Sequence, residues 1–112
     1  MEKFFDLKGC PYGKVNAIRV YSDYSKREGG YCVTAEFIER YPDGMYSKLF
    51  SREYYQHDGD GSVVVCPTAR RNAKKEAAAA ENCSTNAREY ADKFLKHALE
   101  KLNLEADSVT II

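Results

Sequence analysis

The sequence lacks a charge of one sign, a long hydrophobic run and a secretion signal, and each absence excludes a class of protein. Seventeen basic residues balance seventeen acidic ones, so no overall field draws the protein to nucleic acid or to a membrane. No apolar run approaches the length of a membrane span, and no basic segment followed by an apolar one opens the chain. We therefore expect a cytoplasmic protein without membrane contacts, in which any polyanion site is a local patch.

The four cysteines are widely spaced and form no Cys-x-x-Cys pair. This spacing argues against a zinc site and against a redox motif. The four are Cys10, Cys32, Cys66 and Cys83. Reduced thiols are the expected state, with Cys32 and Cys66 in strands and Cys83 beside a helix end. No metal and no cofactor are expected.

Motifs of the common enzyme classes are also missing, and only two histidines are present. The segment around His57, Asp58 and Asp60 has a calcium-type spacing, but its twelfth position is Ala69 where a bidentate glutamate is needed. Asp-Gly pairs that form turns explain the same residues. We expect no catalytic residues, with a small metal-dependent hydrolase built on this segment as the third-ranked alternative.

Length and composition predict one α+β domain that covers residues 1–112. Hydrophobic residues make up 44% of the chain and charged residues 30%, which is ordinary for a globular protein. Stretches rich in β-branched and aromatic residues predict strands over 15–24, 31–41, 45–55, 63–66 and 109–112. Residues 1–14 fit either an edge strand or a helical turn. The expected fold is a mostly antiparallel sheet of four to five strands, followed by helices and a short last strand.

Two C-terminal helices, or one long kinked helix, are expected over residues 68–103. Thr68 is the expected N-cap. Residues 81–86 are poor in helix formers, so a break or kink is expected there, and Asn86 can cap a second helix. The apolar stripe that runs from Ala87 onward continues in phase toward the N-terminus, which leaves the single kinked helix open.

The strongest local signal is the segment Tyr41-Pro42-Asp43-Gly44-Met45, which is typical of a three-residue hairpin loop with a left-handed glycine. This loop places Tyr41 opposite Met45 and fixes the register of the flanking strands. The core side then pairs Phe37 with Leu49, Ala35 with Ser51, and Tyr31 with Tyr55. The opposite side pairs Arg40 with Tyr46, Ile38 with Lys48, Glu36 with Phe50, and Thr34 with Arg52.

Aromatic and basic residues therefore alternate on the opposite side, and we call this set the aromatic ladder. Its members are Tyr46, Lys48, Phe50, Arg52 and Tyr54. Stacked rings between cations are what single-stranded nucleic acid or a nucleotide needs, because bases stack on rings and cations meet phosphates. The alternative is a set of ordinary cross-strand pairs in which Glu36 neutralises its basic neighbours.

A second basic set lies at the expected start of the helix and comprises Arg70, Arg71, Lys74 and Lys75. Together with Thr68, these residues predict an anion site at the helix start. The alternative is a solvated face in which the arginines pair with acids of the preceding loop. Those acids are Glu53, Asp58 and Asp60.

The segment from Ala73 to Ala80, Ala-Lys-Lys-Glu-Ala-Ala-Ala-Ala, resembles the second helix of double-stranded RNA-binding domains. In that family, lysines at the helix start contact phosphates. The resemblance covers this stretch alone, because the helix that precedes the strands in that family has no counterpart here. It implies phosphate binding by Lys74 and Lys75 and no family assignment.

These patterns together predict a small non-enzymatic binding protein that engages a polyanion through the aromatic ladder and the basic helix start. The polyanion is nucleic acid or a nucleotide. The alternative is a protein-binding inhibitor or adaptor of the kind that phages and mobile elements encode, whose partner is a host protein that handles nucleic acid. In that case either the same basic and aromatic patch or the strand over 109–112 docks on the partner or on a second copy of the chain, as a homodimer.

Overall fold

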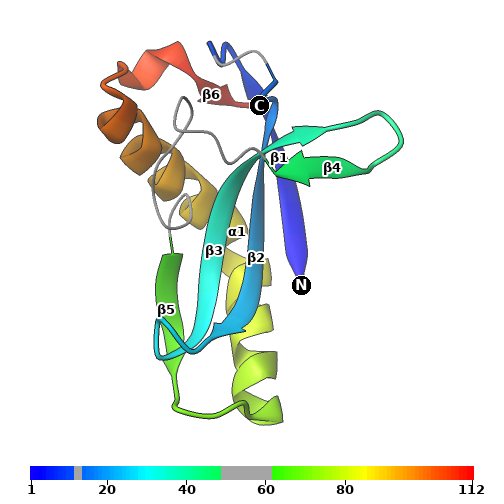
Figure 1. Cartoon of the computed structure of the whole chain (residues 1–112), viewed down its shortest axis with the longest axis vertical. Coiled ribbons are helices and arrows are strands. Elements are labelled where there is room, and N and C mark those ends of the chain that lie inside the picture. Colours follow the sequence, from blue (N-terminus) through cyan, green and yellow to red (C-terminus); the bar gives the residue numbers. More distant parts are fainter. Residues whose placement is uncertain (12–13, 49–61) are drawn as a thin grey trace.

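The computed structural model describes residues 1–11, 14–48 and 62–112, and Figure 1 shows their arrangement. One sheet is followed by one long helix and a short last strand, so the predicted α+β class is confirmed. The elements are β1 (Glu2–Lys8), β2 (Ala17–Ser25), β3 (Gly30–Arg40), β4 (Tyr46–Lys48), β5 (Ser62–Pro67), α1 (Ala73–Leu102), a 3-10 helix (Ala106–Ser108) and β6 (Thr110–Ile111). The N-terminal segment is a strand and not a helical turn.

All strand pairs of the described sheet are antiparallel, in the order β4-β3-β2-β1-β6. Strand β5 also pairs with β3, on the edge that β4 uses, because β2 occupies the other edge. The two short strands therefore divide this edge, with β4 at the C-terminal end of β3 and β5 at its N-terminal end. Figure 1 shows β5 and the β3–β4 hairpin at opposite ends of the sheet.

The hairpin register after β3 is confirmed where the structure describes it. The backbone N–H of Tyr41 donates to the carbonyl of Met45 at 2.8 Å, and Gly44 has a left-handed φ of 89°. Arg40 pairs with Tyr46, and the next pair on the same face follows the predicted register. The loop type that the proline, aspartate and glycine predict therefore determines which residues of β4 lie opposite Arg40 and Ile38.

Further along β3, the predicted pairing is wrong. Thr34 pairs with Ser62 and Tyr31 with Cys66, so β5 occupies the positions that the sequence had assigned to Arg52 and Tyr55. A hairpin loop fixes register only near itself, and the apolar strand β5 competes for the rest of the same edge.

Helix α1 is continuous from Ala73 to Leu102, so the alternative of one long helix is confirmed and the alternative of two helices with a break is not. The side-chain amide of Asn86 donates to Asn82 Oδ1 at 3.0 Å, and the Tyr90 hydroxyl donates to the same oxygen at 2.9 Å. Cys83 and Ala87 are buried against the sheet. Burial of this stripe therefore overrides the weak helix propensity of the segment, and Asn86 lies within the helix instead of capping one.

The core lies between α1 and one face of the sheet. Apolar residues of the helix stripe meet alternate residues of β2 and β3, including the predicted core positions of β3. These are Ile18, Val20, Val33, Ala35 and Phe37 from the sheet and Ala91, Phe94, Leu95, Ala98 and Leu99 from the helix. Of the described residues, no helix is both long and apolar enough to span a membrane.

Candidate functional site

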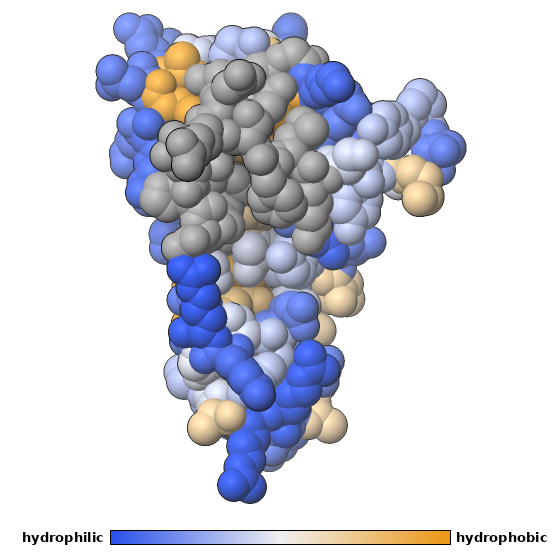
Figure 2. Space-filling view, viewed as in Figure 1, coloured by the Kyte–Doolittle hydropathy of each residue, from blue (hydrophilic) through white to orange (hydrophobic). Residues whose placement is uncertain are grey.

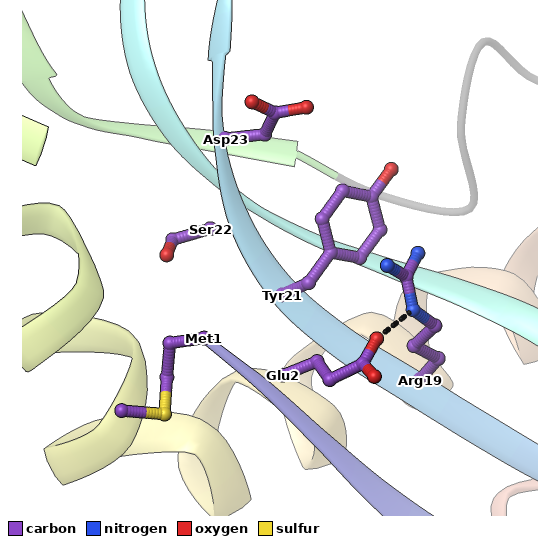
Figure 3. Close-up of a pocket in the computed structure, with 6 residues that line it drawn as sticks. All are labelled: Met1, Glu2, Arg19, Tyr21, Ser22 and Asp23. Atoms are coloured by element: carbon purple, nitrogen blue, oxygen red, sulfur yellow. Dashed lines mark hydrogen bonds and ion pairs between the residues drawn. The ribbon is translucent and has the colours of Figure 1, made fainter.

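The sheet face opposite α1 carries a cluster centred on Arg19, which we call the Arg19 cluster. Its Nε lies 2.7 Å from Glu2 Oε2, and its Nη1 lies 2.7 Å from Glu36 Oε1. The guanidinium carbon also lies 3.9 Å from the centroid of the Tyr21 ring and 5.2 Å from that of Tyr46. Figure 3 shows Arg19 beside Tyr21 with its bond to Glu2. Strands β1 to β4 thus each contribute one group around a single cation.

Burial and charge pairing oppose each other at Arg19. Burial disfavours the charged guanidinium, but hydrogen bonds to Glu2 and Glu36 outweigh it, so the pKa of Arg19 is raised. Burial, and then the Glu36 carboxylate, raise the pKa of the Tyr21 hydroxyl. Glu36 is only 5% exposed. The positive charge of Arg19 is therefore neutralised within the protein, and the cluster joins the strands instead of presenting a cation.

Part of the predicted aromatic ladder can be placed. Tyr46 lies on the face opposite α1, as predicted, where its ring centroid is 5.5 Å from that of Phe4. The guanidinium of Arg40 lies 4.3 Å from the Phe4 ring centroid. Lys48 belongs to β4 and pairs with Ile38. The remaining ladder residues, Phe50, Arg52 and Tyr54, lie outside the described residues. Tyr46 therefore contacts the protein's own side chains on at least two sides.

The predicted basic helix start has a different local structure from the one expected. Asn72 is the N-cap, and its Oδ1 accepts hydrogen bonds from the backbone N–H groups of Lys74 and Lys75 at 3.0 and 3.2 Å. Arg70 and Arg71 therefore precede the helix, and Thr68 is not its N-cap, which corrects both assignments. The Thr68 hydroxyl instead accepts from the backbone N–H of Arg70 at 3.4 Å. Asparagine is as good an N-cap as threonine or better, and the cap position four residues later places both arginines on a connecting segment.

Hydrogen bonds hold this connecting segment against the β2–β3 turn. The backbone N–H of Thr68 donates to the carbonyl of Gly29 at 3.1 Å, and the Tyr24 hydroxyl donates to the carbonyl of Ala69 at 2.7 Å. The hydroxyl of buried Tyr31 accepts from the backbone N–H of Asn72 at 2.8 Å. The turn and the arginine segment are therefore fixed side by side.

The contact creates a basic hollow of about 550 Å³. Its lining comprises Tyr24, Lys26, Ala69, Arg70 and Arg71, and none of these is acidic. The guanidinium of Arg71 lies 5.6 Å from the centroid of the Tyr24 ring. We call this hollow with its surrounding cations the basic end. The cations are Lys26, Arg27, Arg70, Arg71, Lys74 and Lys75.

The basic end carries more positive than negative charge. Its two segments, residues 23–30 and 67–76, hold six basic side chains against Asp23, Glu28 and Glu76. Within the described part of the chain, Lys26, Arg70, Arg71 and Lys74 form no ion pair. Figure 2 shows hydrophilic residues gathered at this lower end of the molecule. The acids that the sequence offered as partners for the arginines, Glu53, Asp58 and Asp60, lie outside the described residues.

The described residues of the two predicted basic sets lie at different ends of β3. The connecting segment joins the sheet where Gly30 pairs with Pro67, whereas Tyr46 pairs with Arg40 at the other end of β3. A strand advances about 3.3 Å per residue, so these points are separated by roughly 33 Å. Tyr46 and the connecting segment with Arg70 and Arg71 therefore lie on two separate parts of the surface.

Sequence reasoning missed Tyr24 and Lys26 as members of the basic end. Both belong to the end of β2 and the turn after it, more than forty positions before Arg70. Their neighbourhood depends on β5 pairing with the start of β3, which no local pattern indicates. The only available signal was that a polar turn containing Lys26 follows an aromatic strand.

The segment with His57, Asp58 and Asp60 lies outside the described residues. Across residues 1–11, 14–48 and 62–112, no three His, Cys, Asp or Glu side chains form a group that could hold a metal ion. None of the four cysteines forms a disulfide among the described residues, and burial raises the pKa of Cys32 and Cys83.

In comparisons with known proteins, no family model matches the sequence, and no curated protein and no solved structure is detectably similar to it.

Proposed function

We propose that this is a non-enzymatic binding protein that holds a polyanion, nucleic acid or a nucleotide, at its basic end. The observation that carries the proposal is the convergence of Lys26, Arg70 and Arg71 on one hollow that has no acidic side chain in its lining. Like charges held together without a counter-charge destabilise a protein, so a bound anion is the natural complement.

The size and chemistry of the hollow favour phosphate-bearing ligands. About 550 Å³ accommodates a group of nucleotide size. Two guanidinium groups can each form paired hydrogen bonds with phosphate oxygens, which an ammonium cannot. Lys74 and Lys75 extend the positive surface along the first turn of α1, as a phosphate backbone longer than one nucleotide would need.

Fluorescence anisotropy with a labelled single-stranded oligonucleotide at low salt tests the proposal. We expect the double variant Arg70→Glu, Arg71→Glu to bind at least about tenfold more weakly, because two phosphate contacts become repulsions. A matched control reverses two exposed lysines farther along the same helix, Lys93→Glu with Lys96→Glu, and is expected to bind within about twofold of the wild type.

Competition with unlabelled mononucleotides then separates the two ligand classes. A nucleotide site predicts that a mononucleotide displaces the oligonucleotide at similar concentration, whereas a nucleic-acid site predicts that displacement requires a longer strand. Wild-type protein that binds neither ligand at low salt, or equal loss of binding in both double variants, would contradict the proposal.

A further inference from the structure

The outer edge of β1 is paired along only part of its length. Leu7 pairs with Ile111 and Lys8 with Thr110, and the N–H of Ile112 donates to the carbonyl of Asp6 at 2.9 Å. Of the described residues, no strand pairs with this edge beyond Asp6. The rest of β1 therefore forms one edge of the described sheet.

The direction of the backbone groups follows from the hydrogen bonds at both ends of β1. Met1 and Leu7 bond to β2, through Ser22 N–H to Met1 and Leu7 N–H to Asn16, whereas Asp6 bonds to the β6 side. Successive residues of a strand alternate, so the N–H and C=O groups of Glu2 and Phe4 point away from β2. These four groups lie in line with β6 and have no backbone partner in the described part of the chain.

At the end of this edge where β6 pairs, an arginine side chain binds the backbone carbonyls. Arg88 of α1 donates to the carbonyls of Ile111 and Ile112 at 3.4 and 3.3 Å. Its guanidinium carbon also lies 5.4 Å from the centroid of the Phe5 ring. The carbonyls at the end of β6 thus have a partner from the helix, whereas Glu2 and Phe4 have none on the described part of the chain.

We propose that an extended segment of a different protein adds to the sheet beside Glu2–Phe4, antiparallel to β1 and in line with β6. Addition of a strand to a sheet edge supplies main-chain hydrogen bonds for affinity, while side chains on both faces select the partner. This site lies outside the basic end, and the inference does not depend on the polyanion proposal.

The charges on β1 argue against a second copy of this chain as the occupant. If the β1 strands of two copies paired antiparallel about a two-fold axis, residues whose backbone groups point away from β2 would have to lie opposite each other. The axis would then pass through Glu2, Lys3 or Phe4. The first places Glu2 opposite Glu2, and the second places Lys3 opposite Lys3. The third places Glu2 opposite Asp6, whose carbonyl is already bonded to Ile112. Like charges directly opposite each other destabilise a strand pair, so each register opposes self-association.

The same side chains define the chemistry of the partner. Phe4 favours an apolar residue opposite it, Lys3 an acidic one and Glu2 a basic one, in that order along the added strand. Lys3 is exposed and forms no ion pair among the described residues, whereas Glu2 already bonds to Arg19. The acidic residue opposite Lys3 is therefore the main determinant of specificity.

A capped peptide, Phe-Glu-Arg-Val-Thr, is the probe, because it places Phe, Glu and Arg opposite Phe4, Lys3 and Glu2 and begins after the position opposite Asp6, which Ile112 occupies. Its control has the same composition with Glu and Arg exchanged. Amide chemical shifts of the full-length protein are followed by NMR during each titration. We expect shifts at residues 2–5 and at least about fivefold tighter binding of the first peptide.

Two variants sharpen the test. Lys3→Glu is expected to reverse the order of the two peptides, whereas Lys8→Glu, at the part of β1 that β6 already covers, is expected to leave it unchanged. N-methylation of the Phe and Arg amides of the first peptide removes two main-chain donors and is expected to abolish binding.

Equal affinity for both peptides, shifts outside β1, or a dimer in solution whose interface contains β1 would each overturn the inference. The variant Arg70→Glu, Arg71→Glu is expected to bind the first peptide like the wild type. This variant therefore shows whether a negative result concerns strand addition at β1 or polyanion binding at the basic end.

Discussion

The Arg19 cluster and the basic end use the same kinds of side chain in opposite ways. Arg19 touches two tyrosine rings and two carboxylates, so its charge is neutralised inside the protein. Arg71 also approaches a tyrosine ring, but no carboxylate of the described residues pairs with it. The proposed binding surface therefore contains the arginine that has no counter-charge among the described residues, and not the arginine that has two.

Removal of Arg19 is expected to have the largest effect on stability. Arg19→Met leaves the nearly buried Glu36 without this ion pair, and we expect a loss of roughly 2–3 kcal/mol in the free energy of unfolding. Urea denaturation measures this loss. Arg70→Met, which removes an exposed arginine, is the matched control and should change stability by less than about 0.5 kcal/mol. Similar losses of stability in the two variants would contradict the distinction between an arginine paired inside the protein and an exposed one.

Gly30→Ala should disturb the basic end through its backbone. A Cβ at Gly30 would lie 2.6 Å from the Cys66 carbonyl oxygen and 2.8 Å from the Thr68 nitrogen. We expect a loss of about 1–3 kcal/mol in stability together with weaker polyanion binding, because the arginine segment is displaced from the turn. Urea denaturation and anisotropy measure the two effects. At Gly29 an added side chain would meet open space, so Gly29→Asn should retain both the stability and the polyanion binding of the wild type.

Alkaline pH should act on the Arg19 cluster. Because the pKa of Tyr21 is raised by burial and by Glu36, the folded state holds this proton more tightly than the unfolded state does. The resulting stabilisation is present below the ordinary tyrosine pKa of about 10 and is lost as the pH rises through the raised value. Tyr21→Phe should therefore lose less stability than the wild type between about pH 9 and about pH 11 in urea denaturation. An identical decline in the two proteins would show that Tyr21 does not contribute.

Local signals predicted those parts of the fold that local geometry determines. The Pro42-Asp43-Gly44 loop fixed the pairing of Arg40 with Tyr46, and the register that follows from it placed Ala35 and Phe37 on the side of β3 that packs in the core. The continuity of α1 and the competition of β5 for the edge of β3 depend on burial between distant segments. Residue propensity in a single sequence does not contain that information.

The residues of the candidate site also fall into those that a local pattern predicts and those that only tertiary contacts bring together. Arg70, Arg71, Lys74 and Lys75 were predicted from their spacing alone, although the helix starts later than expected. Tyr24 and Lys26 join them only because β5 brings the connecting segment back to the β2–β3 turn. The neutralisation of Arg19 was equally hidden, because its partners come from β1 and β3.

The salt dependence of oligonucleotide binding tests the central comparison most directly. The slope of log affinity against log salt reports the number of phosphates that the protein neutralises. The account predicts that Arg71→Met lowers the magnitude of this slope by about 1, whereas Arg19→Met leaves it unchanged. A slope that falls with Arg19→Met and not with Arg71→Met would contradict the assignment of the polyanion site to the basic end.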